Sequence, residues 1–297
     1  MISILIPVFN QNVNTLVARL SAGLSHLGQA GEIVVMEDGS DAAYQQINSP
    51  LATLPFVRYI PHAQNHGRIR IRQMLAAAAT GEWLLFLDGD SELGSDNFLQ
   101  QYFLAIEPNT GVLVGGRTYS AMPPDDCRLR LHWKYGSARE CRRPGEKQQP
   151  AFMTNNFLIQ AQYFNQLSFD TGGKGYGHED TWIGIQVEMA GISVAYIDNP
   201  VLHAGLEENT TFLAKSENAL LNLHKLSTQV PGDMLAGHVK LFRVYQSFKA
   251  WNCLWIPRLV YGLMKKYIHR NLHSCNPSLT FFDLYRLQYF IRLNNQK

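Results

Sequence analysis

The segment EWLLFLDGDSELG, residues 82–94, runs five consecutive apolar residues into two aspartates separated by one glycine. A short apolar run that ends abruptly in polar residues is typical of a buried strand in a parallel sheet. Asp88 and Asp90 carry like charges at short range, so one of them would take up a proton unless a positive charge lay nearby. A divalent cation supplies such a charge, because hard cations bind carboxylate oxygens. The segment therefore predicts a strand with a metal site at its end.

The segments before this strand alternate between strand and helix patterns. Apolar runs predict the strands, and apolar residues at helical spacing followed by glycine predict the helices. The predicted strands are residues 2–8, 32–40, 56–60 and 82–88, and the predicted helices are residues 14–28 and 67–81. Short joins between them indicate an α/β fold with a Rossmann-like, mostly parallel sheet flanked by helices.

Polar residues follow three of these strands, and ligands bind at the carboxyl ends of parallel strands. Phe9 and Asn10 follow the first strand, Asp38 the second, and Asp88 and Asp90 the fourth. We expect these residues to converge at one edge of the sheet. The first strand is followed by VFNQNVN rather than GxGxxG, and GxxxxGK[ST] is absent, which excludes a dinucleotide fingerprint and a Walker phosphate loop.

The start of the helix at 67–81 carries a candidate phosphate site. Asn65 and Gly67 introduce this helix, and Arg68 and Arg72 lie one turn apart on one face, whereas Arg70 points away. Arginine near a helix N-terminus suits a diphosphate. For Arg70 a solvated helix face is the preferred interpretation.

The alternation weakens after residue 110. Strand patterns recur at 111–119, 151–160 and 192–203, and residues 120–150 have the composition of a surface excursion. The glycine-dense segment GGKGYGHED (172–180) precedes another helix. Helical patterns then occupy residues 210–228 and 233–294, with breaks expected near Pro231, Pro257 and Pro277. We divide the chain into an α/β domain, 1–228, with two halves at 1–110 and 111–228, and a helical extension, 229–297.

The charge of the chain is uneven. Residues 231–297 contain ten Lys/Arg and two Asp/Glu, a balance of +8, and residues 1–230 contain 16 and 22, a balance of −6, which together give the net charge of +2. A net charge this small gives no reason to expect a nucleic acid partner. Basic and aromatic residues mix over 235–270. This pattern fits a helix on an anionic membrane surface, and it also fits helices packed on the preceding domain or on a second copy, which is the preferred interpretation.

The four cysteines form no CxxC pair, and the N-terminus has no basic region of a secretory signal. We therefore expect reduced thiols and a cytoplasmic protein, with any membrane contact peripheral and on the cytoplasmic face. Consistent with this, no uncharged apolar run reaches the ~18–20 residues of a membrane-spanning helix.

Four segments, in this order, resemble a family 2 glycosyltransferase. They are ISILIPVFN, VVMEDGSD, NHGRIRIRQMLAAAATGEWLLFLDGDS and GYGHEDTWIGIQVEMAG. The last segment also resembles the galactosyl- and N-acetylgalactosaminyltransferase module, in which a glycine-rich loop precedes Glu-Asp and a histidine lies downstream. The resemblance implies an inverting nucleotide-sugar enzyme of the GT-A fold over about residues 1–210.

The resemblance also implies roles for individual residues. Residues expected to bind the nucleotide-sugar are Pro7, Phe9, Asn10, Asp38, Asn65, Gly67, Arg68, Arg72 and Asp88, with Asp38 at the uracil edge of a UDP-sugar. Asp88 and Asp90 would form the D-x-D that bridges the ribose and a Mn²⁺ or Mg²⁺ ion on the diphosphate, with His203 as a further ligand.

The catalytic roles fall in the second half of the chain. Asp180 would be the general base, and Glu179 would orient the sugar or the acceptor. The loop at 172–178 would close over the donor. Asn155 and Asn156 are also expected to bind the donor. They lie where the related module has small residues beside the donor sugar, so the sugar cannot be carried over from the resemblance. The resemblance makes residues 1–228 the catalytic domain, with 1–110 as its nucleotide-binding half and 111–228 as its acceptor and sugar half.

The predicted function is a metal-dependent inverting transfer from a nucleotide-sugar, with UDP as the preferred nucleotide, to a glycan or lipid-linked acceptor in polysaccharide or glycoconjugate synthesis. One alternative is a phosphatase of the haloacid-dehalogenase type that uses Asp88 and Asp90. Its D-x-D normally lies on the first strand and is followed by Thr, whereas here the motif follows the fourth strand and precedes Ser91. The other alternative is a non-catalytic scaffold that binds a nucleotide-sugar or glycan.

Overall fold

The computed structural model of the 297-residue chain describes residues 1–141, 152–168 and 177–295. The strands are β1 (Ile2–Val8), β2 (Gly31–Asp38), β3 (Val57–His62), β4 (Trp83–Leu87), β5 (Ser91–Leu93), β6 (Val112–Val114), β7 (Arg117–Thr118), β8 (Asn156–Gln160), β9 (Val194–Tyr196) and β10 (Val201–His203). The α-helices are α1 (Asn14–Leu27), α2 (Ala42–Asn48), α3 (Arg68–Ala78), α4 (Phe98–Ala105), α5 (Arg130–Arg139), α6 (Ala161–Phe164), α7 (Glu179–Met189), α8 (Asn209–Leu226), α9 (Gly232–His238), α10 (Lys240–Ala250), α11 (Trp255–Leu272) and α12 (Leu279–Asn294). Two short 3₁₀ helices, η1 (Ser49–Thr53) and η2 (Cys127–Leu129), complete them.

The chain forms two compact units that alternate along the sequence. Unit 1 comprises Met1–Tyr119, Cys141–Phe169 and Gln186–Gly205, and unit 2 comprises Ser120–Glu140, Asp170–Ile185 and Leu206–Lys297. All ten strands named above belong to unit 1. The boundary predicted at residue 228 stays a prediction.

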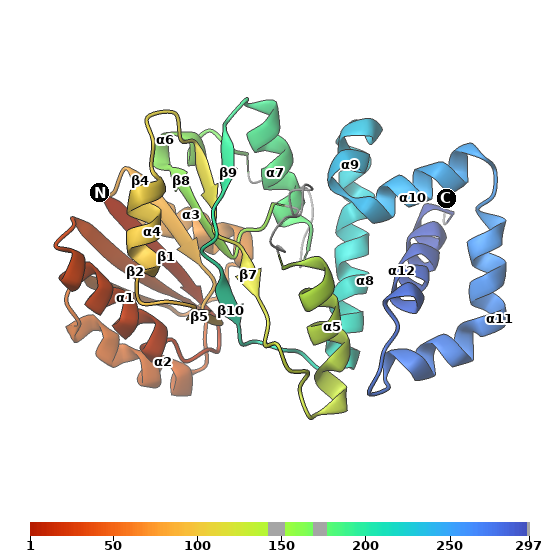
Figure 1. Ribbon diagram of the computed structural model, residues 1–297, viewed down its shortest axis with the longest axis horizontal. Helices are drawn as coiled ribbons and strands as arrows, with labels where there is room; N and C mark the ends of the chain where they lie inside the picture. Colours follow the sequence, from red (N-terminus) through yellow and green to blue (C-terminus); the bar gives the residue numbers. More distant parts are fainter. Residues whose placement is uncertain (142–151, 169–176, 296–297) are drawn as a thin grey trace. The chain divides into compact units, whose positions relative to one another are not determined.

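The main sheet of unit 1 has seven strands in the order β3-β2-β1-β4-β8-β6-β9 (Figure 1). Strands β3, β2, β1 and β4 pair in parallel, and β8 alone runs antiparallel to both of its neighbours, β4 and β6. The central strands β1 and β4 are almost wholly buried and apolar because helices cover both of their faces, whereas the edge strand β3 has no buried residue. The predicted α/β fold with a mostly parallel sheet is confirmed.

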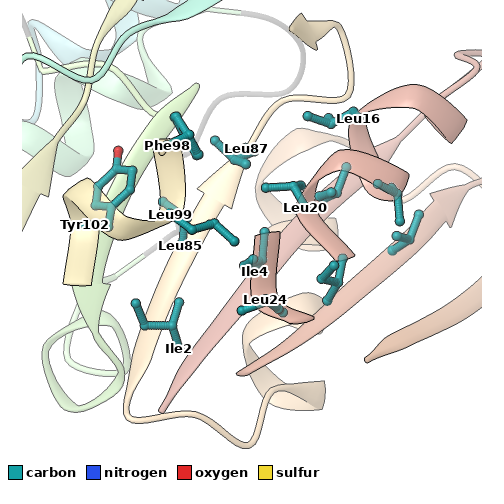
Figure 2. Close-up of a cluster of buried hydrophobic side chains, with 14 of the residues drawn as sticks. Ile2, Ile4, Leu16, Leu20, Leu24, Leu85, Leu87, Phe98, Leu99 and Tyr102 are labelled. Carbon is teal, nitrogen blue, oxygen red and sulfur yellow. The ribbon is translucent and has the colours of Figure 1, made fainter. Parts of the chain in front are cut away.

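The core of unit 1 lies between the sheet and the helices α1 and α4 (Figure 2). Leu16, Leu20 and Leu24 recur every four residues on α1 and face β1, whose Ile2 and Ile4 point the same way because alternate strand residues share a face. On the other side α3 contacts β1 and β2. This packing holds the carboxyl ends of β1, β2 and β4 at one edge.

A second sheet, in the order β5-β10-β7, lies beside that edge. In it β10 pairs antiparallel with β5, which sets His203 opposite Ser91. The predicted single strands at 111–119 and 192–203 were therefore wrong in one respect. Each contains two strands, and in each case the first joins the main sheet and the second joins the small one.

Unit 2 is helical. One cluster of buried apolar side chains joins α8, α9, α10 and α12, and another joins α5, α8, α11 and α12. The predicted surface excursion at 120–150 contains helix α5. The predicted breaks near Pro231, Pro257 and Pro277 are confirmed, because α9, α11 and α12 each begin close to one of these prolines. Pro257 itself lies in the first turn of α11, where a missing N–H costs no helical hydrogen bond.

The cysteine prediction needs a correction. Cys127 and Cys275 form a disulfide within unit 2, so these two residues are not reduced thiols, whereas Cys141 and Cys253 are. Because 148 residues separate the two half-cystines, sequence spacing gave no sign of the pair.

None of the helices in the described ranges combines the length and the hydropathy that crossing a membrane requires.

Candidate active site

The aspartate pair lies in a tight turn at the end of β4. The N–H of Ser91 donates to the carbonyl of Asp88 (3.1 Å), and the N–H of Asp88 donates to the carbonyl of Asn155, just before β8 (3.0 Å). A Cβ atom on Gly89 would lie 3.3 Å from the carbonyl oxygen of Pro7. Glycine between the two carboxylates therefore lets this turn lie close against the end of β1.

Asp88 is held by arginines. Its Oδ1 accepts a hydrogen bond from Nη2 of Arg72 at 2.6 Å, and its Oδ2 lies 3.8 Å from Nη2 of Arg117. Arg72 is buried, and its Nη1 also donates to the carbonyl of Arg68, one turn earlier (3.1 Å). A guanidinium on a carboxylate is a strong charge-assisted pair. The protein itself thus supplies part of the positive charge that the sequence requires at this turn.

Asp90 has a different environment. Its Oδ2 lies 3.4 Å from Nδ1 of His203 on β10, and its carbonyl accepts a hydrogen bond from the N–H of Ala204 (3.1 Å). Burial alone would raise the pKa of Asp90. The hydrogen bond and charge of His203, followed by the charges of Arg117 and Arg68, outweigh burial and lower that pKa below its ordinary value. Asp90 is therefore a carboxylate at neutral pH.

The second oxygen of Asp90 fits a cation. Oδ1 is buried and has no hydrogen-bond partner among the described residues, which is costly for a carboxylate unless a ligand satisfies it. His203 adds an imidazole, a common metal ligand. No group of three His, Cys, Asp or Glu side chains that could hold a metal occurs in the described ranges. A cation at Asp90 would therefore take its other ligands from substrate oxygens and water, as Mg²⁺ does where a protein offers one or two carboxylates.

The residue at the end of β2, Asp38, accepts hydrogen bonds from the segment that leads into α3. The carboxylate of Asp38 is buried and accepts hydrogen bonds from the N–H groups of His66 (2.6 Å) and Gly67 (3.0 Å), and Asn65 Nδ2 donates to the Asp38 carbonyl (2.9 Å). Gly39 has a φ of +73°, and a Cβ there would lie 2.5 Å from the Asn65 nitrogen. The predicted residues Asp38, Asn65 and Gly67 thus meet in one hydrogen-bonded group.

The end of β1 lies beside this group. The N–H of Asn10 donates to Ser40 Oγ (2.9 Å). The side-chain Nδ2 of Asn10 donates to Oδ2 of Asp41 (3.2 Å), and its Oδ1 accepts a hydrogen bond from the N–H of Asp41 (2.8 Å). The side chain of Phe9 is exposed, with 55% of its surface accessible. An exposed ring beside Asp38 offers a stacking face for a nucleobase.

Two residues near the site had no role in the predicted site, although Glu37 belongs to the polar cluster after the second predicted strand. Glu37 is fully buried and accepts hydrogen bonds from Ser40, from Asn48 Nδ2 (2.8 Å) and from the Tyr59 hydroxyl (3.1 Å), which fixes the loop after β2. The positive charge of Arg117 acts on both aspartates, because its Nη2 lies 3.8 Å from Oδ2 of Asp88 and its charge helps to lower the pKa of Asp90. Its only sequence signal was an arginine directly after a Gly-Gly at a strand end.

The two neighbouring asparagines differ. Asn156 is fully buried and its side chain is used by the fold, because it accepts from the Tyr102 hydroxyl (2.6 Å) and donates to the carbonyls of Gly116 and Asn199 (2.9 Å each). Asn155 is buried next to Asp88, and its Oδ1 has no hydrogen-bond partner among the described residues. Of the two, Asn155 retains an acceptor for a ligand.

Glu179 and Asp180 belong to unit 2, whereas the other predicted site residues belong to unit 1. They begin α7, and Glu179 Oε2 accepts a hydrogen bond from the N–H of Gly177 (2.8 Å). Burial and the charge of Arg286, opposed by Glu179, lower the pKa of His178 from 6.5 to about 4. Residues 172–176 of the predicted closing loop lie outside the described residues, so that loop and the roles of Glu179 and Asp180 stay predictions.

The sequence was compared with protein families and curated proteins. The sequence model of Glycosyl transferase family 2 matches residues 3–173, more than half of the chain. Polypeptide N-acetylgalactosaminyltransferase 12 of Mus musculus is 27% identical over 195 residues, which cover 59% of this chain and 34% of the mouse protein. Polypeptide N-acetylgalactosaminyltransferase 4 of Mus musculus is 24% identical over 238 residues, 68% of this chain and 39% of the relative. The chain thus spans little more than a third of the length of these two relatives.

Solved structures with a similar fold include two bacterial or archaeal transferases. A mannosyltransferase from Pyrobaculum calidifontis, in complex with GDP-Man and Mn²⁺, has a TM-score of 0.61 at 13% identity and covers 99% of this chain and 87% of its own. Glucosyl-3-phosphoglycerate synthase from Mycobacterium tuberculosis, in complex with Mn²⁺, UDP and glucosyl-3-phosphoglycerate, has a TM-score of 0.52 at 16% identity, with coverages of 78% and 81%. At these identities the likeness concerns the fold, and it confirms the expected GT-A type.

Proposed function

Because the chain belongs to glycosyl transferase family 2 and is therefore a glycosyltransferase, we propose that it transfers a sugar from a UDP-sugar to a hydroxyl group of a glycan or lipid-linked saccharide. The reaction depends on a divalent metal and inverts the anomeric centre. The observation that carries this proposal is the buried Oδ1 of Asp90, which has no hydrogen-bond partner in the part of the chain that the structure describes and lies beside His203 at the end of the central strand β4. The family membership sets aside the phosphatase and scaffold alternatives.

The nucleoside half of the donor would bind at the ends of β1 and β2. Phe9 would offer its exposed ring to the base, and the carboxylate of Asp38, which two backbone N–H groups hold in place, would accept a hydrogen bond from the uracil edge. The nucleotide is the less constrained part of the proposal, since the two similar transferases carry GDP-Man and UDP. We prefer UDP because the family resemblance implies that Asp38 lies at the uracil edge; a carboxylate can also accept hydrogen bonds from the N–H groups of guanine, so GDP-mannose belongs in the test.

The diphosphate half would bind at Asp90. Asp90 and His203 would hold a Mn²⁺ or Mg²⁺ ion, and Mn²⁺ accompanies the nucleotide in both similar transferases. When bound, such an ion neutralises charge on the departing UDP. Arg72 forms a close ion pair with Asp88 and holds it in place, and Arg117 adds positive charge beside both carboxylates. Asn155 Oδ1 would accept a hydrogen bond from a hydroxyl group of the donor sugar.

Asp180 would act as the general base. A carboxylate within hydrogen-bond reach of the acceptor hydroxyl takes its proton as the oxygen attacks, and this contributes about 10²–10⁴-fold to the rate. Glu179, next to it at the start of α7, would orient the sugar or the acceptor. A single base and a single displacement give inversion.

The test is nucleotide release and transfer with a panel of UDP-sugars and GDP-mannose, with and without Mn²⁺. We expect one UDP-sugar to be turned over only with metal. Asp90→Asn should abolish that turnover, whereas Asp96→Asn, at an aspartate whose side chain is fully exposed, should leave it unchanged. Asp180→Asn should lower kcat by about 100-fold or more while nucleotide binding persists.

Two outcomes would contradict the proposal. Metal-independent turnover that survives Asp90→Asn would contradict the proposed metal site at Asp90. NMR of the anomeric proton gives the configuration of the product. A product with the donor's configuration would contradict the role of Asp180 as the base of a single displacement.

A further inference from the structure

Helix α11 exposes an apolar stripe. Trp255, Leu259, Leu263 and Tyr267 are spaced four residues apart, so they form one line along the helix. All four are exposed, from 53% of the surface of Leu259 to 79% of that of Leu263. Seven of the fifteen exposed large apolar side chains among the described residues lie between 251 and 267; these seven are Trp251, Trp255, Ile256, Leu259, Val260, Leu263 and Tyr267. Exposed apolar side chains concentrated in this way mark an interaction surface.

This stripe is not the face that α11 uses for folding. Ile268 and Leu272 are buried in the cluster with α12, and Tyr261 and Met264 pack against the same cluster. A surface helix of a globular protein normally carries polar residues opposite its buried face. Helix α11 is apolar on both faces, so the outer stripe serves something other than the core of unit 2.

The structure divides the basic and aromatic segment 235–270. Leu235, Val239 and Phe242, on and between α9 and α10, are buried in the unit 2 core. Packing within the protein therefore accounts for the first part of the segment. It does not account for the seven exposed apolar side chains between Trp251 and Tyr267.

The charge around the stripe has one sign. Residues 249–273 contain five Lys/Arg and no Asp or Glu. The five are Lys249, Arg258, Lys265, Lys266 and Arg270, and all are exposed. Exposed aromatic and aliphatic side chains flanked only by cations are the pattern of a helix that lies in an anionic lipid interface.

We propose that α11 binds flat on an anionic phospholipid bilayer, with the stripe Trp255–Leu259–Leu263–Tyr267 in the headgroup and upper acyl region and the basic residues on the lipid phosphates. A second copy of this chain is a poorer occupant, because joining two such faces would bring five cations against five cations. Tryptophan and tyrosine suit the interface because each has an apolar ring with a polar edge. The inference does not depend on the donor or on the metal site.

Co-sedimentation of the full chain with vesicles tests the proposal. We expect binding to vesicles of phosphatidylcholine with phosphatidylglycerol, and little binding to phosphatidylcholine alone. Leu263→Glu should weaken binding by about tenfold or more, since it removes apolar burial and adds a negative charge. The matched control is Leu104→Glu on α4, where the leucine is similarly exposed (76%) but lies outside the stripe, and its binding should equal that of the unaltered chain.

The charge contribution is tested separately. Lys265→Gln with Lys266→Gln should weaken vesicle binding by about fivefold per lysine, and added salt should weaken binding of the unaltered chain. Lys225→Gln with Lys240→Gln, at exposed lysines outside the stripe, is the control pair. All of these positions are exposed, so thermal unfolding should show that each variant folds.

Two results would overturn the proposal. One is the absence of binding to anionic vesicles, or binding that Leu263→Glu and Leu104→Glu reduce equally. The other is a dimer in sedimentation equilibrium that Leu263→Glu dissociates, without vesicle binding, because the stripe would then be a contact between two copies of the chain.

Discussion

Asp88 and Asp90 look equivalent in the sequence, but the structure gives them different roles. Asp88 forms an ion pair with the buried Arg72, and Asp90 lies beside His203 with one oxygen unsatisfied among the described residues. The sequence could predict that two carboxylates end β4 and that positive charge must lie near them. It could not predict that arginines from α3 and β7 supply part of that charge, because those contacts depend on tertiary packing.

The difference predicts unequal effects on stability. Asp88→Asn leaves the buried guanidinium of Arg72 without its counter-charge, and we expect the free energy of unfolding to fall by about 2–3 kcal/mol. Asp90→Asn should cost less, because it loses the contact with His203 at 3.4 Å and longer-range attraction to Arg117 and Arg68, but no close guanidinium pair. Urea unfolding of both variants at neutral pH measures the difference. Equal losses would show that the arginine pairing of Asp88 is not a stabilising contact.

His178 gives a prediction about pH. Its pKa falls from 6.5 to about 4 in the folded chain, so the unfolded chain binds the proton more readily between these values. The corresponding stability is fully present above pH 6.5 and is lost as the pH falls toward 4, by about 1–3 kcal/mol. His178 has a φ of +64°, which asparagine tolerates, so His178→Asn should remove this part of the pH dependence. The measurement is urea unfolding of both proteins at pH 7 and pH 5, and identical slopes with pH would contradict the assignment.

At the scale of the elements, apolar pattern predicted β1, β2, β4 and α1 well because each is one uninterrupted, strongly patterned segment. It failed where one apolar run serves two sheets. The run at 111–119 divides at Gly115 and Gly116, and Gly116 has a φ of +78°. Helix α5 was missed because it is rich in basic and polar residues and only Leu131, His132 and Gly136 are buried, which leaves little apolar periodicity to detect.

Glu32 joins several elements of unit 1 and gives a second prediction about stability. Its carboxylate accepts hydrogen bonds from Ser3 on β1 (2.7 Å), from the Thr80 N–H before β4 (2.6 Å) and from Arg58 on β3 (3.2 Å). Burial would raise the pKa of Glu32, but these hydrogen bonds together lower it.

A lowered carboxyl pKa stabilises the fold above the ordinary value of 4.5, and this contribution is lost as the pH falls below it. We expect Glu32→Gln to reduce the free energy of unfolding by about 1 kcal/mol at pH 7 and by less at pH 4. Chemical unfolding at both pH values is the check. A loss of the same size at pH 4 would mean that packing, rather than the charge, makes the difference.

At the scale of the whole molecule, composition showed a basic C-terminal part but not how the chain builds its two units. Unit 2 gathers residues 120–140, 170–185 and 206–297, which are far apart in sequence. Contacts between residues so far apart in the sequence produce no local pattern of apolar residues from which they could be predicted. For the same reason the disulfide between Cys127 and Cys275 was unforeseen, and the expectation of reduced thiols rested only on the absence of paired spacing.

The disulfide should contribute to the stability of unit 2. It closes a loop of 148 residues, and cross-links of long loops typically stabilise by about 2–4 kcal/mol. Cys127→Ser with Cys275→Ser, or a reductant, should lower the melting temperature. Cys141→Ser with Cys253→Ser is the control and should change it little. If reductant leaves the melting temperature unchanged, the cross-link does not stabilise the fold.

The central claim is that the end of β4 is a metal-dependent site for the diphosphate of UDP. Thermal unfolding with UDP, GDP, CMP and dTDP, each with and without Mn²⁺, tests it most directly. Ligand at 100 times its dissociation constant stabilises by about 2.7 kcal/mol, which raises the melting temperature by several degrees. We predict that UDP does this only with Mn²⁺, that Asp90→Asn removes the shift, and that Asp96→Asn retains it. A shift with UDP that needs no metal, or that survives Asp90→Asn, would contradict the claim.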